Sequence, residues 1–433
     1  MKKIFYPSIN ETLYTGFLDN GLEVTLLPKP DFHKTYGLFT TNYGSIDNDF
    51  IPLGQEEFTK VPDGIAHFLE HKLFEKEDED VFQRFGRQGA SSNAFTSFTR
   101  TSYLFSSTDN TLQNIETLLD FVQDPYFTEE SVNKEKGIIA QEIRMYQDDP
   151  NWRLFFGILN NLYPKHPLHI DIAGTEESID KITAEDLYLC YNTFYHPSNM
   201  NLFIVGNMEP ESLMNFIKDN QEKKDFVPSQ PIERRFPIES AKDIIKEDSI
   251  ELSVSRPKAI IGLKGLDTVP EDGFERLKYQ TSIQLLLQLL FGETSQSYLE
   301  MYNEGLIDDS FSYDFTLDRS FHFADFSSDT NEPKHFANQM INLILKSKDS
   351  PELTERNLNL AKRKMMGKHL QSLDSLEYIA NQFSGMKFGD TTLFDFAEVI
   401  DSIELKDLQA VHETFIRPEG LSRFFIYPKE NKR

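Results

Sequence analysis

The stretch His67-Phe68-Leu69-Glu70-His71 is the most informative part of the chain. On an α-helix, His67 and His71 lie one turn apart on the same face, so both imidazoles can reach one ion. Two neutral histidine nitrogens suit Zn²⁺, and a catalytic zinc site adds a third protein ligand and leaves a position for water. Glu70 lies in the same arc, where it is placed to take that water's proton without binding the metal. The alternative is an amphipathic helix whose histidines make hydrogen bonds in a core.

A third ligand has to come from a separate element, and a second predicted helix offers two candidates. Glu135 and Glu142 are seven residues apart, which is two helical turns, so they share one face. Ile138, Ile139 and Ile143 form an apolar side that would pack this helix inward. A glutamate close to buried apolar residues is costly unless it is paired or bound to metal. The spacing leaves open that both are solvated helix glutamates.

Both halves of the chain show a similar succession of patterns. Strands are predicted from alternating or β-branched stretches, and helices from apolar positions at a period of 3.6. In the first half, strands are expected at residues 21–27, 35–41, 94–106 (one or two) and 200–205, and helices at 64–74, 111–122, 129–146 and 184–195. In the second half, strands are expected near 259–263 and between 310 and 327, and helices near 274–291, 335–346 and 353–383. The succession predicts an α+β protein.

A charged stretch with several prolines, residues 222–246, separates the halves and is typical of a linker. We therefore expect a domain with the zinc motif over residues 1–225 and a linker over 226–246. A second domain without the zinc motif is expected over 247–433.

The composition limits the classes of function. Lys and Arg number 44 and Asp and Glu 70, so the formal charge is −26, which argues against a nucleic-acid partner. The single cysteine, Cys190, excludes an intramolecular disulfide framework and a Cys-rich metal cluster. No stretch approaches the roughly 18 apolar residues of a membrane span, and no signal peptide is recognisable. We expect a cytoplasmic protein with no membrane partner. A second histidine pair, His166 and His169, has Pro167 between its members and predicts a structural role.

Four stretches of the first half carry recognisable motifs. They are Gly64 to Phe74, Gly89 to Thr96, Glu135 to Ile143 and Tyr195 to Met200. With them the chain resembles the pitrilysin and insulin-degrading-enzyme family of zinc peptidases, the inverzincins. It resembles most the two-domain bacterial members related to mitochondrial processing peptidase, those of Gram-positive bacteria in particular. The resemblance implies two homologous α/β-sandwich domains of the LuxS/mitochondrial-processing-peptidase-like metallohydrolase type.

The resemblance also implies roles for particular residues. By position, His67, His71 and Glu142 are the zinc ligands, and Glu70 is the general base. Glu135 is the carboxylate that supports the site without binding the metal, a role that metal sites generally need. The implied activity is that of a zinc metalloendopeptidase, a processing-protease-like subunit. It would hydrolyse peptide bonds in short or unfolded peptides, with Glu70 activating a zinc-bound water.

The strand near residues 92–97 resembles the family's substrate-binding edge. There an extended peptide would add as an extra strand through main-chain hydrogen bonds. Asn93 and Ala94 are the substrate-binding candidates, with the Asn93 side chain holding the peptide backbone. The alternative is an ordinary strand rich in Phe and Thr.

Active members of the family also use an Arg and a Tyr from the second domain to hold the substrate carbonyl and stabilise the oxyanion. By the register of the segment here, Met301 and Asp308 take those two places, and Tyr313 and Arg319 lie nearby. We therefore expect a heterodimer in which a related subunit without the zinc motif supplies Arg and Tyr. Two other functions are retained: a non-catalytic peptide-binding or assembly subunit of the same fold, and a metal-dependent hydrolase of a non-peptide substrate.

Overall fold

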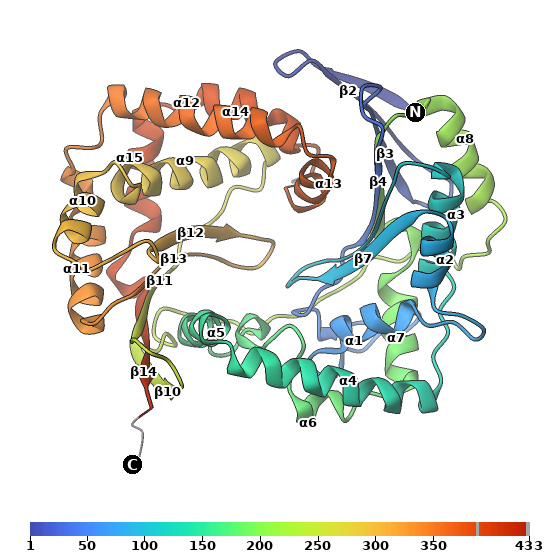
Figure 1. Ribbon diagram of the computed structural model, residues 1–433, viewed down its shortest axis with the longest axis horizontal. Helices are drawn as coiled ribbons and strands as arrows, with labels where there is room; N and C mark the ends of the chain where they lie inside the picture. The colour runs from blue at the N-terminus through green and yellow to red at the C-terminus, as the bar shows by residue number, and fades with distance from the viewer. Residues whose placement is uncertain (387–388, 430–433) are drawn as a thin grey trace. The chain divides into compact units, whose positions relative to one another are not determined.

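A seven-stranded sheet and a five-stranded sheet organise the computed structural model, which describes residues 1–386 and 389–429 (Figure 1). Each sheet is the centre of one compact unit. The first unit comprises Met1–Ile143, Asp171–Phe236 and Ser372–Met386, and the second comprises Arg144–Ile170, Pro237–Gln371 and the described part of Lys387–Arg433.

The first sheet has the strand order β1-β2-β3-β9-β4-β8-β7. Its strands are β1 (Lys2–Tyr6), β2 (Glu11–Phe17), β3 (Glu23–Pro28), β4 (Thr35–Thr41), β7 (Ala90–Thr96), β8 (Thr101–Ser107) and β9 (Met200–Gly206), and β5 (Asp49–Phe50) pairs separately with β6 (Thr59–Lys60). The helices that follow these strands in the chain are α1 (Ile65–Leu73), α2 (Val81–Arg87), α3 (Thr111–Val122), α4 (Glu129–Asp148), α6 (Glu176–Ile179), α7 (Ala184–Phe194) and α8 (Pro210–Gln221). One face of the sheet and the buried sides of these helices share a single apolar core, with Phe39, Tyr103 and Leu202 contributed by strands.

The second sheet has the order β10-β14-β11-β13-β12. Its strands are β10 (Glu247–Leu252), β11 (Lys258–Lys264), β12 (Ser312–Leu317), β13 (His322–Asp329) and β14 (Leu421–Pro428). The helices of the second half are α9 (Gly273–Phe291), α10 (Gln296–Asn303), α11 (Pro333–Lys346), α12 (Glu355–Ser372), α13 (Leu376–Gly385), α14 (Phe396–Ser402) and α15 (Leu405–Phe415).

The two sheets repeat one topology. Numbered along the chain, the strands β3, β4, β7, β8 and β9 lie in the order 1-5-2-4-3, and β10 to β14 lie in the same order. In each sheet the first pair, β3 with β9 or β10 with β14, is parallel, and the following pairs are antiparallel. Both units are therefore mixed helix-and-sheet domains of the same architecture, as predicted, and β12 is the counterpart of the edge strand β7.

Each half of the chain gives one helix to the other half's sheet. Helix α13 packs on β4 and β9, where the rings of Phe383 and Phe203 lie 4.5 Å apart. Helix α5 (Pro150–Leu162) packs on β11 and β14, so closely that a Cβ at Gly262 would lie 2.6 Å from Ile158 and 2.7 Å from Leu162. These two helices bury their apolar sides on sheet faces that the remaining helices leave uncovered.

This exchange makes the observed units differ from the contiguous division into residues 1–225 and 247–433. Residues 144–170 belong to the second unit and residues 372–386 to the first. The predicted linker is also divided, with its part up to Phe236 in the first unit. The order of the two sheets along the chain is as expected, but burial of α5 and α13 decides to which unit each helix belongs.

One predicted helix is in fact two. The stretch 353–383 is interrupted between α12 and α13, because Ser375 caps a new helix start: its side chain accepts the N–H of Tyr378 at 3.2 Å. Other predictions agree closely with the structure: β4 and α3 have the predicted bounds of 35–41 and 111–122.

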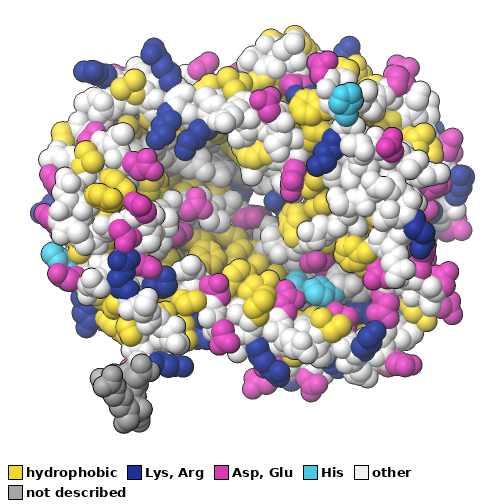
Figure 2. Space-filling view, viewed as in Figure 1, with side chains coloured by type: hydrophobic (Ala, Val, Ile, Leu, Met, Phe, Trp, Pro, Cys, Tyr) yellow, Lys and Arg dark blue, Asp and Glu magenta, His cyan; other side chains and the backbone are white. Residues whose placement is uncertain are grey.

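Acidic side chains are spread over the face of the molecule that Figure 2 shows. On the face shown in Figure 2, Asp and Glu side chains are interspersed with Lys, Arg and uncharged groups rather than gathered into one patch. Among the described residues, no helix is long and apolar enough to cross a membrane.

Candidate metal centre

Helix α1 presents the two histidines. The helix begins after Gly64, whose φ of +87° lies in the left-handed region and whose missing Cβ leaves room for the carbonyl of Ala173. Its buried side includes Phe68, Leu69 and Leu73 and anchors the helix in the core. Because these positions face inward, the partly exposed His67 and His71 share another face of the helix, as the spacing predicts.

Helix α4 starts as predicted. Thr128 caps it by accepting the N–H of Ser131 at 3.2 Å, and Phe127 and Val132 are both buried at staple spacing. These contacts fix the direction in which the helix leaves the core.

The apolar side of α4 is narrower than predicted. Ile139 and Ile143 are buried, but Ile138 is 49% exposed. Ile138 lies three residues after Glu135 and four before Glu142, so it shares the stripe of the two glutamates and not that of the core.

The structure brings His67, His71 and Glu142 together. One ligand atom from each lies within 4.8 Å of the others, with Nε2 of His67 3.7 Å from Oε1 and Nε2 of His71 3.6 Å from Oε2 of Glu142. These separations exceed hydrogen-bond length. They are close to the roughly 3.3–3.6 Å between ligand atoms at tetrahedral corners about 2.0–2.2 Å from a zinc ion. The donor set of two imidazoles and one carboxylate therefore fits Zn²⁺.

Glu135 lies behind one of the histidines. Its Oε1 is 3.0 Å from Nδ1 of His71, so His71 donates from Nδ1 and turns Nε2 toward Glu142. This is the contact of a carboxylate that orients a metal-binding imidazole.

Replacing Glu135 by glutamine should weaken zinc binding by about 10–100-fold, because the amide supports the His71 tautomer less well than a carboxylate does. Competition with a chromogenic chelator measures the change in affinity. Glu130→Gln, at an exposed position of the same helix, should leave the affinity unchanged. Equal affinities for Glu135→Gln and the parent chain would contradict a supporting role.

Burial and neighbouring carboxylates set the protonation of the two imidazoles. It lowers the pKa of His67 to about 3, an effect that the neighbouring His71 reinforces, so His67 is neutral and its lone pair is available. For His71, burial acts in the same direction, but the hydrogen bond to Glu135 and the carboxylates of Glu70, Glu135 and Glu142 outweigh it and raise the pKa. Binding of a metal at His71 is therefore coupled to release of its proton at low pH.

Glu70 lies in the turn between the histidines. It is only 8% exposed, and the hydroxyl of Thr96 donates to its Oε2 at 2.6 Å. Burial raises the pKa of Glu70, and the hydrogen bond from Thr96 opposes that shift. Thr96 was not predicted to contact the site. Its signal in the sequence is its position two residues after Ala94, on the side of β7 that faces the helices.

Strand β7 is the edge of its sheet, and its outer side is open to a further strand. The N–H of Ser97 donates to the carbonyl of Arg100 at 2.8 Å and sets the hairpin register, in which Ala94 is opposite Tyr103. In this register the main-chain groups of Ala94 point away from β8. The side-chain oxygen of the exposed Asn93 accepts the Ala94 N–H at 2.9 Å. The two substrate-binding candidates thus lie on an accessible edge, beside the strand residue that contacts Glu70.

The positions expected for Arg and Tyr lie in the second unit. Met301 is fully buried in α10, and the Asp308 carboxylate accepts from Arg256 at 2.6 Å. Tyr313 lies on β12, where its ring contacts that of Phe291. Met301 and Asp308 therefore have packing and ion-pair roles within this unit.

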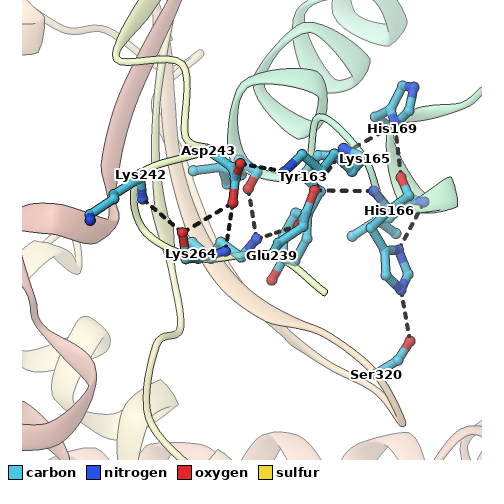
Figure 3. A network of polar contacts seen from close by, with 12 residues as sticks. Tyr163, Lys165, His166, His169, Glu239, Lys242, Asp243, Lys264 and Ser320 are labelled. Atoms are coloured by element: carbon cyan, nitrogen blue, oxygen red, sulfur yellow. Dashed lines mark hydrogen bonds and ion pairs between the residues drawn. The ribbon is translucent and has the colours of Figure 1, made fainter. Parts of the chain in front are cut away.

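The second histidine pair belongs to a separate polar network, also in the second unit (Figure 3). Nδ1 of His166 accepts the N–H of Leu168, its Nε2 lies 3.2 Å from the Ser320 hydroxyl, and Nδ1 of His169 lies 2.7 Å from the His166 carbonyl. In the same network the buried Lys264 donates to Glu239. These contacts within the protein agree with the structural role predicted for the pair.

A histidine pair and a glutamate thus meet from two helices, in a protein of two topologically equivalent units, and their donor atoms suit a zinc ion. Residues 50–176 match the insulinase (peptidase family M16) sequence family, and residues 181–365 match the family described as the peptidase M16 inactive domain. The chain is 51% identical to a Bacillus subtilis (strain 168) protein described as an uncharacterized zinc protease, YmfH, over 99% of this chain and 100% of that one.

Solved structures give the same result. An M16-like peptidase from Alicyclobacillus acidocaldarius has 37% sequence identity and a TM-score of 0.92, covering 97% of this chain and 99% of that one. A protease from Helicobacter pylori has 20% identity and a TM-score of 0.81, covering 96% and 99%, and supports the fold alone. The chain belongs to peptidase family M16, and the expected likeness to family members of Gram-positive bacteria is confirmed by the identity to YmfH. Its cofactor is Zn²⁺, in agreement with the relatives that are named zinc proteases.

Proposed function

We propose that the chain is the zinc-binding subunit of a metalloendopeptidase that cuts short or unfolded peptides. The observation that supports this function best is the convergence of His67, His71 and Glu142 from two separate helices, with one ligand atom of each within 4.8 Å of the others. In this proposal these three residues hold Zn²⁺ and Glu135 orients His71.

The chain's own residues would divide the reaction between them. When bound, zinc supplies Lewis-acid chemistry: it lowers the pKa of a coordinated water and polarises the scissile carbonyl. Glu70 takes the proton at its carboxylate and returns it to the leaving amine, and the Thr96 hydroxyl holds that carboxylate in place. The outer edge of β7 binds the peptide in extended form through main-chain groups such as those of Ala94. This alignment limits the substrates to segments that are free to become a strand.

The partner is the second part of the proposal. Met301 and Asp308 stand where the family's pattern expects Arg and Tyr, so no pair from those two positions is available to stabilise an oxyanion. We propose that a related subunit without the zinc motif supplies both groups. The same absence of Arg and Tyr at positions 301 and 308 also supports the alternative, a peptide-binding or assembly subunit without catalysis.

A peptide-library digest tests the proposal. The zinc-loaded chain alone should cut the library little, and adding the related subunit should raise the rate by at least about 10²–10³-fold, the typical effect of a single oxyanion donor. Chelation should abolish cleavage and added zinc should restore it. Strong cleavage by the isolated chain would contradict the partner requirement. A complex that binds zinc and peptides but never cuts would favour the assembly role, and zinc-dependent hydrolysis confined to non-peptide esters would overturn the peptidase.

A further inference from the structure

We propose that Arg100 is a positioning residue that ties helix α13, from the second half of the sequence, to the edge strand β7. The proposal rests on the proposed function in one respect, that β7 is the edge to which peptide is added. It concerns the face of β7 opposite to the zinc helix, and it assigns no part in metal binding to Arg100.

The β7–β8 hairpin fixes where the Arg100 side chain lies. The Arg100 N–H donates to Oγ of Ser97 at 3.2 Å and its carbonyl accepts the Ser97 N–H, so the backbone of the turn is held at both groups. Phe95 is opposite Ser102 in the register, and Arg100 precedes Ser102 by two residues. The side chains of Phe95 and Arg100 are therefore on the same face of the hairpin, the face away from Thr96 and Glu70.

On that face the guanidinium lies close to two groups. Its Cζ is 5.8 Å from the centre of the Phe95 ring, within the range of a cation–π contact. The second group is Gly385, the last residue of α13. A Cβ at this glycine would overlap Nη1 of Arg100 and lie 2.9 Å from Nη2 and 3.0 Å from Cζ. The guanidinium thus occupies the space that any other residue at 385 would need.

The end of α13 is a favourable place for this cation. The last carbonyls of a helix carry the negative end of its dipole, which attracts Arg. The helix itself is held on the first sheet by the contact of Phe383 with Phe203, by a 3.5 Å hydrogen bond from Asn381 to the Tyr36 hydroxyl, and by the Thr40 and Ser384 hydroxyls at 3.5 Å. Because α13 is anchored on β4 and β9, its contact with Arg100 transmits that anchoring to the edge hairpin.

Strand β7 is consequently braced from both faces and open only at its edge. Thr96 bonds Glu70 on the helix face, and Phe95 contacts Arg100 and, through it, Gly385 on the other. Loss of the second contact would let the edge shift relative to Glu70 while leaving the zinc ligands on α1 and α4 in place. Small misplacements of this kind cost up to about 10²-fold in rate.

A double-mutant cycle in the full-length chain tests this coupling. Gly385→Ala is compatible with the helical backbone, so its effect comes from displacing Arg100. Gly385→Ala and Arg100→Met should each speed hydrogen exchange of peptides covering residues 90–107, at unchanged zinc content. In the complete enzyme each should raise KM more than it lowers kcat, with kcat/KM reduced about tenfold. Combined, they should do no more than Arg100→Met alone, because the guanidinium that the new methyl group displaces is already gone.

Gly367→Ala on α12 is the matched control, since a Cβ there would meet nothing within 4 Å, and it should leave all readouts unchanged. Additive effects of Gly385→Ala and Arg100→Met, or unchanged hairpin exchange in both single variants, would overturn the proposal. Hydrogen exchange tests the role of Arg100 even if the enzyme proves inactive. Failure of the proposed function is recognised separately, because the parent complex would then cleave no peptide. If Arg100→Met does not fold, three other variants test the proposal: Gly385→Ala, Gly385→Ser and Gly367→Ala. The rate of hydrogen exchange in the β7–β8 hairpin should rise with the size of the side chain at position 385, and it should not change in Gly367→Ala.

Discussion

Replacement of Glu70 by glutamine is expected to lower kcat/KM by about 10²–10⁴-fold while zinc stays bound, because the amide cannot accept the proton that the carboxylate takes. The substitution keeps the shape of the side chain, and the amide oxygen still accepts from the Thr96 hydroxyl. The three proposed zinc ligands are untouched. Steady-state cleavage of a quenched fluorescent peptide by the complete enzyme, together with zinc analysis of the same sample, measures both quantities.

Glu77→Gln is the matched control for this variant. Glu77 is exposed and lies shortly after the zinc helix, so the same change of charge is made at a position without contact to the site. It should retain full activity. A Glu70→Gln enzyme that keeps its zinc and cuts at the parent rate would assign the proton transfer to another group.

Replacement of His67 by alanine is expected to weaken zinc binding by more than about 100-fold, since loss of a partner that only orients a ligand already costs about 10–100-fold. The loss of zinc affinity should also reduce the thermal stabilisation that zinc gives to the folded protein. A ligand at about 100 times its Kd stabilises a folded protein by about 2.7 kcal/mol, which corresponds to roughly 5–10 °C in Tm for units of this size. Zinc should raise the Tm of the parent chain by this amount and that of His67→Ala hardly at all.

His33→Ala removes an exposed histidine from the first unit and controls for nonspecific binding to imidazole groups. It should keep both the zinc content and the zinc-dependent rise in Tm. If His67→Ala binds one zinc ion as tightly as the parent chain, the three-residue site is refuted and the ion lies elsewhere.

The elements of the site were predictable because their signals are local. The spacing of His67 and His71 places both on one face of any α-helix. The start of α4 depends on residues that are close together in the sequence, the cap Thr128 and the apolar pair of Phe127 and Val132. Ile138 was assigned to the wrong side of α4, because three isoleucines within six residues span more of a helix than a single buried stripe. The hairpin of β1 and β2 escaped prediction for a related reason: its strands are only partly buried and lack a clear alternation of apolar and polar residues.

Contacts between distant stretches had no such signal. The position of Thr96 in its strand indicates which side of β7 it lies on, but not that it binds Glu70, and the residues around Gly385 do not indicate that it leaves room for Arg100. The exchange of α5 and α13 between the units was not predictable for the same reason. The amphipathic pattern of a helix predicts that one side is buried, but it does not indicate which sheet that side covers.

By itself, the sequence predicted the class of metal, two candidate ligands and a candidate base between them, because a helix places residues four apart on one face whatever surrounds it. Only the tertiary structure decided that Glu142 meets those histidines and that an edge strand lies beside the base. It also decided that a helix from the far end of the chain supports that strand. Such pairings depend on which apolar surfaces are buried together, and burial is a property of the whole fold.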